Sequence, residues 1–170
     1  ACTLDITPFC SLNTPNSLAV CVDNSRQDIP PISGDFTFFG GIYRDVWLTA
    51  VSKQHFHLTN YGSEGIFIST PKVSEEKGTI LIRGDIKNDA TQKALLELEH
   101  IIYHPNGSIA QSLKQSIQIK AGEQYSFRSE TSPILSPQLW TPETPHLYRV
   151  ESILRDKKTK TVLDQSNHYT

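Results

Sequence analysis

Apolar and polar residues alternate with a period of two along most of this chain. From Thr79 to Lys87, the apolar positions form one face of an extended segment and the charged positions form the other. The apolar face contains Ile80, Ile82 and Ile86, and the charged face contains Arg83, Asp85 and Lys87. Residues 113–120 and 148–155 alternate in the same way. This period is typical of β-strands that are buried on one side.

Turn-forming residues separate these segments at short intervals. They are Asn60-Tyr61-Gly62, Glu76-Lys77-Gly78, Pro105-Asn106-Gly107 and Ala121-Gly122-Glu123. Between Lys53 and Gln165 the pattern predicts about seven strands, the number of an immunoglobulin-like β-sandwich. Residues 91–99 also fit one amphipathic helix, but their alternation continues through Ile101-Ile102-Tyr103. We therefore interpret that segment as a strand, and the fold class as all-β.

The first 50 residues do not close a domain by themselves. They contain a predicted strand at Ser17–Asp23, an aromatic stretch at Phe36–Tyr43, and a further apolar segment at Arg44–Leu48. We interpret these as the last strands of a second sandwich whose first half is missing. Such a unit exposes strand edges and apolar faces, so we expect it to be poorly ordered or paired with another chain.

Composition excludes several classes of protein. The 16 basic and 18 acidic residues are interspersed and give a net charge of −2, so the chain lacks the basic stripe of a nucleic-acid-binding protein. No apolar stretch approaches the roughly 18 residues that span a bilayer. Because residue 1 is Ala and the chain contains no Met, we interpret it as an excised piece of a longer protein.

The three cysteines, Cys2, Cys10 and Cys21, form neither a CxxC motif nor a zinc-binding pattern with histidine. We expect buried free thiols. The alternative is a Cys10–Cys21 disulfide, which requires that their strands pair.

Three segments resemble family 2 glycoside hydrolases, the group that includes β-galactosidases, β-glucuronidases and β-mannosidases. LDITPF (4–9) followed by NSLAVCVDN (16–24) is similar to a passage near the end of that family's sugar-binding jelly roll. GIYRDVWL (41–48) resembles the signature that ends the jelly roll. LWTPETPHLY (139–148) resembles a motif late in the family's immunoglobulin-like domain.

The resemblance implies two domains. Residues 1–52 correspond to the C-terminal part of the jelly roll, and residues 53–170 to the immunoglobulin-like β-sandwich. In this family a (β/α)8 barrel follows and performs retaining hydrolysis with two carboxyl groups, about 5–5.5 Å apart. A barrel takes about 250 residues. We therefore expect no catalytic residue in this chain, and a role in holding the jelly roll and the barrel together.

Asp35 is the single predicted substrate-binding residue. It stands six residues before Gly41, in SGDFTFFGG (33–41). The resemblance to the β-galactosidase branch implies that a carboxylate at this spacing reaches a sugar hydroxyl and a bound monovalent cation. A carboxylate suits both partners. The alternative is that Asp35 terminates a Ser-Gly-Asp turn.

Other carboxylates and aromatic residues have structural interpretations. Glu97 and Glu99 share a strand face with Cα atoms about 6.6 Å apart, and we expect a solvated outer face with Leu96 and Leu98 inward. Trp47 and Trp140 suit sugar stacking, but their motifs favour core or domain packing. Arg44 and Asp45 would point to opposite faces of a strand, and we expect each to pair with another group at a domain junction; the alternative is that they bind sugar. Tyr148 is expected to lie in the core.

No metal or cofactor is expected. His55 and His57 share a strand face, but no third ligand is evident. Asn106-Gly107-Ser108 matches the N-glycosylation pattern, and we interpret it as a hairpin turn.

The sequence therefore predicts a non-catalytic segment of a glycoside hydrolase that acts on a terminal β-linked sugar, with galactose as the first candidate. The expected partners are a carbohydrate and the enzyme's own jelly-roll and barrel domains, with no nucleic acid and no membrane. Homo-oligomerisation and a periplasmic or secreted location are left open. The alternative is a non-catalytic carbohydrate-binding or adhesive β-sandwich module. Saturable binding of a free sugar by the chain would favour that alternative.

Overall fold

A computed structural model describes residues 3–11, 13–22, 41–42, 44–59 and 62–170. Contacts divide the chain into two compact units, one formed mainly by Val51–Thr170 and the other by Asp5–Ala50. Each unit is described by itself below. Among the described residues, no helix is both long enough and apolar enough to cross a membrane.

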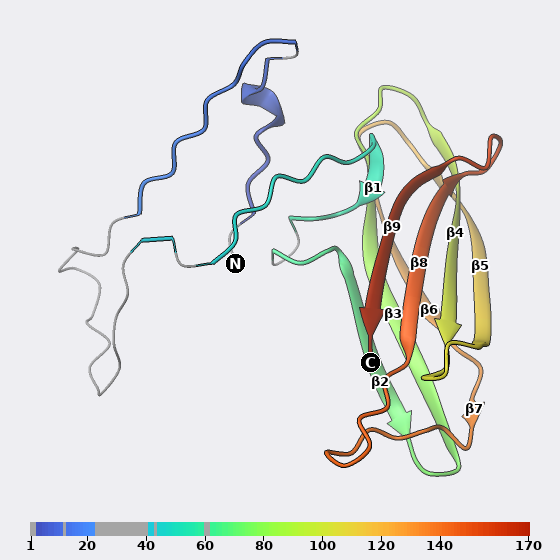
Figure 1. Ribbon diagram of the computed structural model, residues 1–170. Coiled ribbons are helices and arrows are strands. Elements are labelled where there is room, and N and C mark those ends of the chain that lie inside the picture. Colours follow the sequence, from blue (N-terminus) through green and yellow to red (C-terminus); the bar gives the residue numbers. More distant parts are fainter. Residues whose placement is uncertain (1–2, 12, 23–40, 43, 60–61) are drawn as a thin grey trace. The chain divides into compact units, whose positions relative to one another are not determined.

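The larger unit consists of two antiparallel sheets (Figure 1). The first sheet contains β1 (Gln54–Phe56), β2 (Ile66–Val73), β3 (Lys77–Asn88), β6 (Gln124–Glu130) and β7 (Ile134–Leu135). The second has the order β5-β4-β8-β9 and contains β4 (Ala94–Tyr103), β5 (Ile109–Ile119), β8 (Arg149–Asp156) and β9 (Val162–Tyr169). The predicted all-β sandwich is confirmed.

The nine strands occupy seven positions. Strands β2 and β6 both pair with residues 81–84 of β3, so they lie on its opposite edges. Strand β1 pairs with β3 at Ile86 and Lys87, where β6 also pairs, and therefore lies on the β2 edge. By the same reasoning β7 follows β6 on the other edge. The predicted number of about seven strands corresponds to these positions.

The inward faces of both sheets form one apolar core. The alternation predicted for β3 is confirmed, because Ile80, Ile82 and Ile86 are buried. The segment with two interpretations is a strand, since β4 buries Leu96 and Leu98 and pairs with both β5 and β8. Tyr148 lies in the core as expected. Gly84 of β3 has no room for a side chain, because a Cβ atom there would collide with the carbonyl oxygen of Gly65 and the ring of Phe127.

In the smaller unit the structure differs from the prediction. The described part of the predicted strand Ser17–Asp23 is not in a sheet, and neither is the described part of Arg44–Leu48. The one regular element among this unit's described residues is a short 3-10 helix, η1 (Thr7–Phe9). Leu18, Val20 and Val22 are all exposed. An extended backbone becomes a strand only when a neighbour accepts its hydrogen bonds, and no described segment does so here.

His100 is a polar residue inside the core. Its side chain is 1% exposed and its ring lies 5.4 Å from that of Phe127. Nδ1 lies 2.8 Å from the hydroxyl of Ser152, whereas Nε2 is buried with no partner. Burial lowers the pKa of His100 to about 4. The folded sandwich therefore holds a neutral imidazole.

This burial predicts acid sensitivity of the fold. The unfolded chain, in which the histidine pKa is about 6.5, binds more protons than the folded chain as pH falls from there to about 4. The free energy of unfolding should therefore be greatest above about pH 6.5 and should fall by up to about 3 kcal/mol as the pH decreases to about 4. Urea unfolding followed by circular dichroism at several pH values measures this loss.

A His100→Leu variant should lose most of that pH dependence. His146→Gln, which changes a half-buried histidine outside the core cluster, is the matched control and should retain it. An unaltered pH dependence in the leucine variant would contradict the assignment.

Candidate functional site

The outer face of the second sheet carries an array of paired charges. Glu97 and Glu99 of β4 lie opposite Arg155 and Ile153 of β8, respectively. Lys160 lies 2.9 Å from a carboxylate oxygen of Glu97. Glu99 accepts hydrogen bonds at 2.7 Å from Arg155 and 3.1 Å from Ser112, and Lys114 lies 3.0 Å from it. These are the two carboxylates that the sequence placed on one strand face.

Glu99 differs from the prediction of a solvated outer face because its side chain is buried under its partners. Burial alone raises the pKa of Glu99, but hydrogen bonds from Lys114, Arg155 and Ser112 outweigh that effect and hold it below the ordinary value. The hydrogen bond from Lys160 likewise lowers the pKa of Glu97. Neither carboxyl therefore holds a proton at neutral pH, so neither supplies the general acid that glycoside hydrolysis requires.

The same face continues towards the start of β8. The guanidinium carbon of Arg149 lies 3.7 Å from the ring centroid of Tyr103, whose hydroxyl donates a 2.8 Å hydrogen bond to Glu151. Glu151 also accepts a hydrogen bond from Gln165. Each acidic group here has a basic or amide partner, which is typical of a structural surface and not of a substrate pocket.

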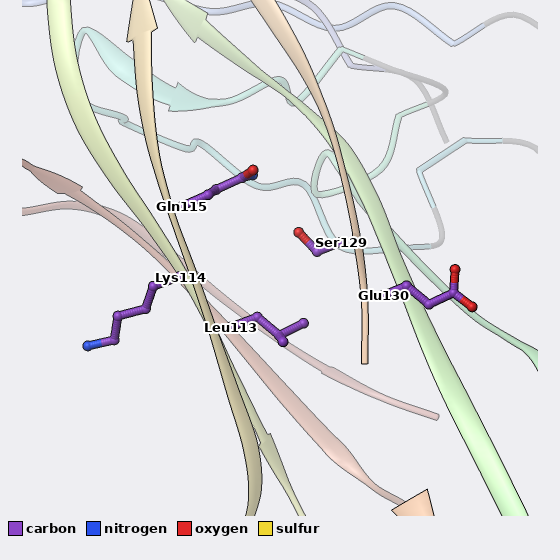
Figure 2. A pocket seen from close by; sticks show the side chains of 5 residues that line it. All are labelled: Leu113, Lys114, Gln115, Ser129 and Glu130. Atoms are coloured by element: carbon purple, nitrogen blue, oxygen red, sulfur yellow. The ribbon is translucent and has the colours of Figure 1, made fainter. Parts of the chain in front are cut away.

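Two hollows open on the larger unit. One, of about 370 Å³, has an apolar lining from the β2–β3 region and the segment between β7 and β8, including Ile134, Leu139, Trp140 and Tyr148. The other, of about 200 Å³, lies between β5 and β6 (Figure 2) and is lined by Leu113, Lys114, Gln115, Ser129 and Glu130. Neither hollow contains a pair of carboxylates among its lining residues.

The tryptophans are not core residues of the described structure. Trp47 is 81% exposed and Trp140 is 57% exposed, so neither has the expected core position, and packing against another domain and the alternative of sugar stacking stay predictions. Pro145 bridges back to Trp140, and the hydroxyls of Thr141 and Thr144 lie 2.8 Å apart within the same turn. This turn holds the Trp140 side chain at the edge of the larger hollow.

The remaining sequence predictions concern Asp35 and the three cysteines. Asp35 and Cys2 lie outside the described residues. Cys10 and Cys21 are free thiols, so the alternative of a disulfide between them is wrong, and both are exposed where burial was expected. Their burial was predicted from strands that do not form in this unit.

The two predicted histidines contact neighbouring protein groups, and Asn106 lies in the predicted turn. Nδ1 of His55 lies 2.9 Å from the Ser52 carbonyl oxygen, and Nε2 of His57 lies 2.7 Å from the Thr59 hydroxyl. Over the part of the chain that the structure describes, no three histidine, cysteine, aspartate or glutamate residues form a metal-binding group. Asn106 lies in a turn, where its side-chain oxygen accepts a hydrogen bond from the Ser108 amide.

Sequence reasoning did not identify a cluster of a serine, a histidine and a glutamate, formed by Ser166, His168 and Glu64. The Ser166 hydroxyl lies 2.9 Å from Glu64 and 2.8 Å from Nε2 of His168, although Glu64 is distant in sequence. Nε2 is also the ring nitrogen that Glu64 faces, at 3.7 Å. A catalytic triad needs the serine and the acid on opposite ring nitrogens, so this cluster does not activate Ser166. No local motif connects the three residues.

The network around Glu99 predicts a measurable effect on stability. Glu99→Gln removes the charge that Arg155 and Lys114 share, and should lower the free energy of unfolding at pH 7 by about 1–2 kcal/mol. Because the folded pKa of Glu99 is lowered, this contribution is present above the ordinary carboxyl pKa and is lost as pH falls below it. Chemical denaturation of both proteins at pH 7 and pH 3 measures the difference.

Glu97→Gln is the matched control on the same strand face. Since Glu97 is solvent-accessible, its replacement should change stability little. Equal losses in the two variants would contradict the distinct role of Glu99.

Comparison with known proteins identifies relatives along nearly the whole chain. The family described as "Glycosyl hydrolases family 2" matches residues 64–170. The crystal structure of a Bacteroides uniformis β-glucuronidase is 70% identical with a TM-score of 0.96, over 99% of this chain and 20% of that chain. A putative β-glucuronidase from Formosa agariphila is 34% identical over 91% of this chain and 17% of its own length.

The beta-galactosidase BoGH2A of Bacteroides ovatus is 28% identical over 91% of this chain, again 17% of its own length. The chain thus spans a fifth or less of the length of each of these relatives. The expected kinship is confirmed, and the chain belongs to family 2 of the glycosyl hydrolases.

Proposed function

We propose that this chain is a non-catalytic β-sandwich segment of a larger enzyme that hydrolyses terminal β-glucuronides. The observation that carries this proposal is the 70% identity to a Bacteroides uniformis β-glucuronidase over 99% of the chain. A structure of Bacteroides uniformis β-glucuronidase 2, also 70% identical to this chain, contains covalently bound cyclophellitol-6-carboxylate aziridine, a carboxylate-bearing compound. Galactose, the first candidate from sequence, becomes the second candidate, which the β-galactosidases among the relatives support.

The reaction itself is assigned to the part of the enzyme outside this chain. A retaining glycosidase places its acid/base and nucleophile about 5–5.5 Å apart across the scissile bond. The paired carboxylates described here are each bound to cationic side chains, and the chain covers a fifth of the β-glucuronidase it resembles. A barrel of about 250 residues in the remaining polypeptide would hold the two catalytic carboxyl groups.

The role of this chain is to join domains. Residues 1–52 would complete a sugar-binding jelly roll, and residues 53–170 would form the immunoglobulin-like domain between it and the barrel. The paired charges on the second sheet stabilise a regular spacer. Exposed apolar side chains such as Leu135, Trp140 and Leu147 provide surface for packing against the other domains.

Asp35 is proposed as this chain's contact with substrate. Its support is its position in SGDFTFFGG, six residues before Gly41, as in the β-galactosidase branch. As a carboxylate, it would accept hydrogen bonds from sugar hydroxyls at the rim of the pocket. Its contribution requires the rest of that pocket.

The second candidate function is that of a free-standing carbohydrate-binding module. It is favoured by one observation, the exposed indole of Trp140 beside the hollow of about 370 Å³. Titration calorimetry of the chain with glucuronic acid and galactose distinguishes the two functions. Saturable binding that Trp140→Ala abolishes would support the module, whereas the segment proposed here should bind neither sugar more tightly than about millimolar.

The test of the main proposal compares two substrates and two proteins. The native polypeptide that contains this sequence should hydrolyse 4-nitrophenyl β-D-glucuronide with a higher kcat/KM than the β-D-galactoside, and the 170-residue chain should hydrolyse neither. In the native enzyme, Asp35→Asn should lower kcat/KM about tenfold or more by removing a charged hydrogen-bond acceptor.

Asp28→Asn removes a negative charge from the same segment without changing the proposed contact residue. It therefore controls for the loss of charge alone and should leave kcat/KM unchanged. A preference for the galactoside would reassign the sugar. Turnover by the chain alone, surviving repurification, would overturn the non-catalytic role.

A further inference from the structure

Strand β5 is an open edge of the second sheet. It pairs with β4 along one side, and along the other side no described segment pairs with it. The strand is eleven residues long, and Lys114 is its one charged side chain. Long edges with few charges are the ones that accept another strand.

Other edges of the sandwich are better protected. Strand β2 contains Pro71 and shifts register between Ser69 and Lys72, both of which disfavour the addition of a strand. At the opposite edge of the second sheet, a carboxylate oxygen of Asp164 in β9 accepts a 2.8 Å hydrogen bond from the Phe56 amide of β1. Strand β9 is therefore tied to the first sheet. Strand β5 is tied only near one end, where the Gln111 side chain forms two hydrogen bonds with the Ser132 backbone, and from Ser112 on no described segment pairs with its outer edge.

The inner side of the β5 edge also contains an unsatisfied polar group. Gln115 lines the hollow of about 200 Å³ between β5 and β6, together with Leu113, Ser129 and Glu130 (Figure 2). Its Nε2 atom is buried and has no hydrogen-bond partner. A buried amide donor without a partner is costly, so a group that supplies an acceptor at this edge gains free energy on binding.

We propose that two copies of this chain associate through antiparallel pairing of their β5 strands, with the twofold axis at Gln115. Because this axis is perpendicular to the sheet, the inner faces of both copies stay on the same side. The side-chain amide of each Gln115 then lies opposite that of Gln115 in the other copy, and its Nε2 donates a hydrogen bond to the Oε1 of that residue. Leu113 lies opposite Ile117, and Lys114 lies opposite Ser116.

Charge selects this register over its neighbour. An axis at Lys114 would pair the full strand but would place two ammonium groups directly opposite each other, which is destabilising. An axis at Gln115 still pairs residues 111–119 and places each ammonium group opposite a serine. It also pairs the amide that lacks a partner, so charge and hydrogen bonding favour the same register.

The test is the self-association of the 170-residue chain, measured by sedimentation velocity over a concentration series. Ser116 is exposed, so its side chain can be changed without disturbing the core. Ser116→Lys would place an ammonium group opposite Lys114 of the other copy twice per dimer, and should raise the dissociation constant at least about tenfold. Ser116→Glu would create two attractive pairs and should lower it about threefold. High salt should reduce both differences.

Three results would overturn the proposal. They are a monomeric wild-type chain at every concentration, changes of the same sign in the lysine and glutamate variants, and loss of association in Trp140→Ala. Trp140 lies beside the other hollow, so its replacement should leave the dissociation constant unchanged. Circular dichroism of each variant verifies that the sandwich is folded before its association is compared.

Discussion

Strand β3 is the constraint on which the larger unit depends. It hydrogen-bonds to four other strands, along both of its edges, and supplies Ile80, Ile82 and Ile86 to the core. At Gly84 the carbonyl oxygen of Gly65 and the ring of Phe127 approach so closely that any side chain would force them apart. The first sheet is assembled around this one backbone, and the second sheet packs against the face that it buries.

The closure of the core determines where function can reside. With the inner faces of both sheets packed, polar chemistry is left to the outer faces, the strand edges and the connecting segments. On the outer face of the second sheet, cationic neighbours bind Glu97 and Glu99 and keep them ionised. This arrangement of outer-face charges supports the proposed role of a spacer between domains.

Local patterns predicted the parts of this structure that depend on local chemistry. Alternation identified β3, β5 and β8, and its continuation past Glu99 distinguished β4 from a helix. What the patterns missed depends on neighbours distant in sequence. Glu99 is buried because Arg155 and Lys114 cover it, and Cys10 and Cys21 are exposed because the predicted strands of their unit lack partners. For Asp35, the sequence motif remains the support, since the site it is proposed to serve requires groups from outside this chain.

The pairing of β4 with β8 has a consequence for how the protein folds. It joins Leu96 to Asp156 and Tyr103 to Arg149, so the centre of the second sheet is made by segments far apart in the chain. Contacts of such long range form slowly, because a large loop must close before they contribute. During synthesis, β3, β4 and β5 leave the ribosome before β8 has been made. Until β8 pairs with β4, the apolar faces of these strands stay partly exposed to solvent. The second sheet is therefore expected to complete its folding later than segments whose contacts are local.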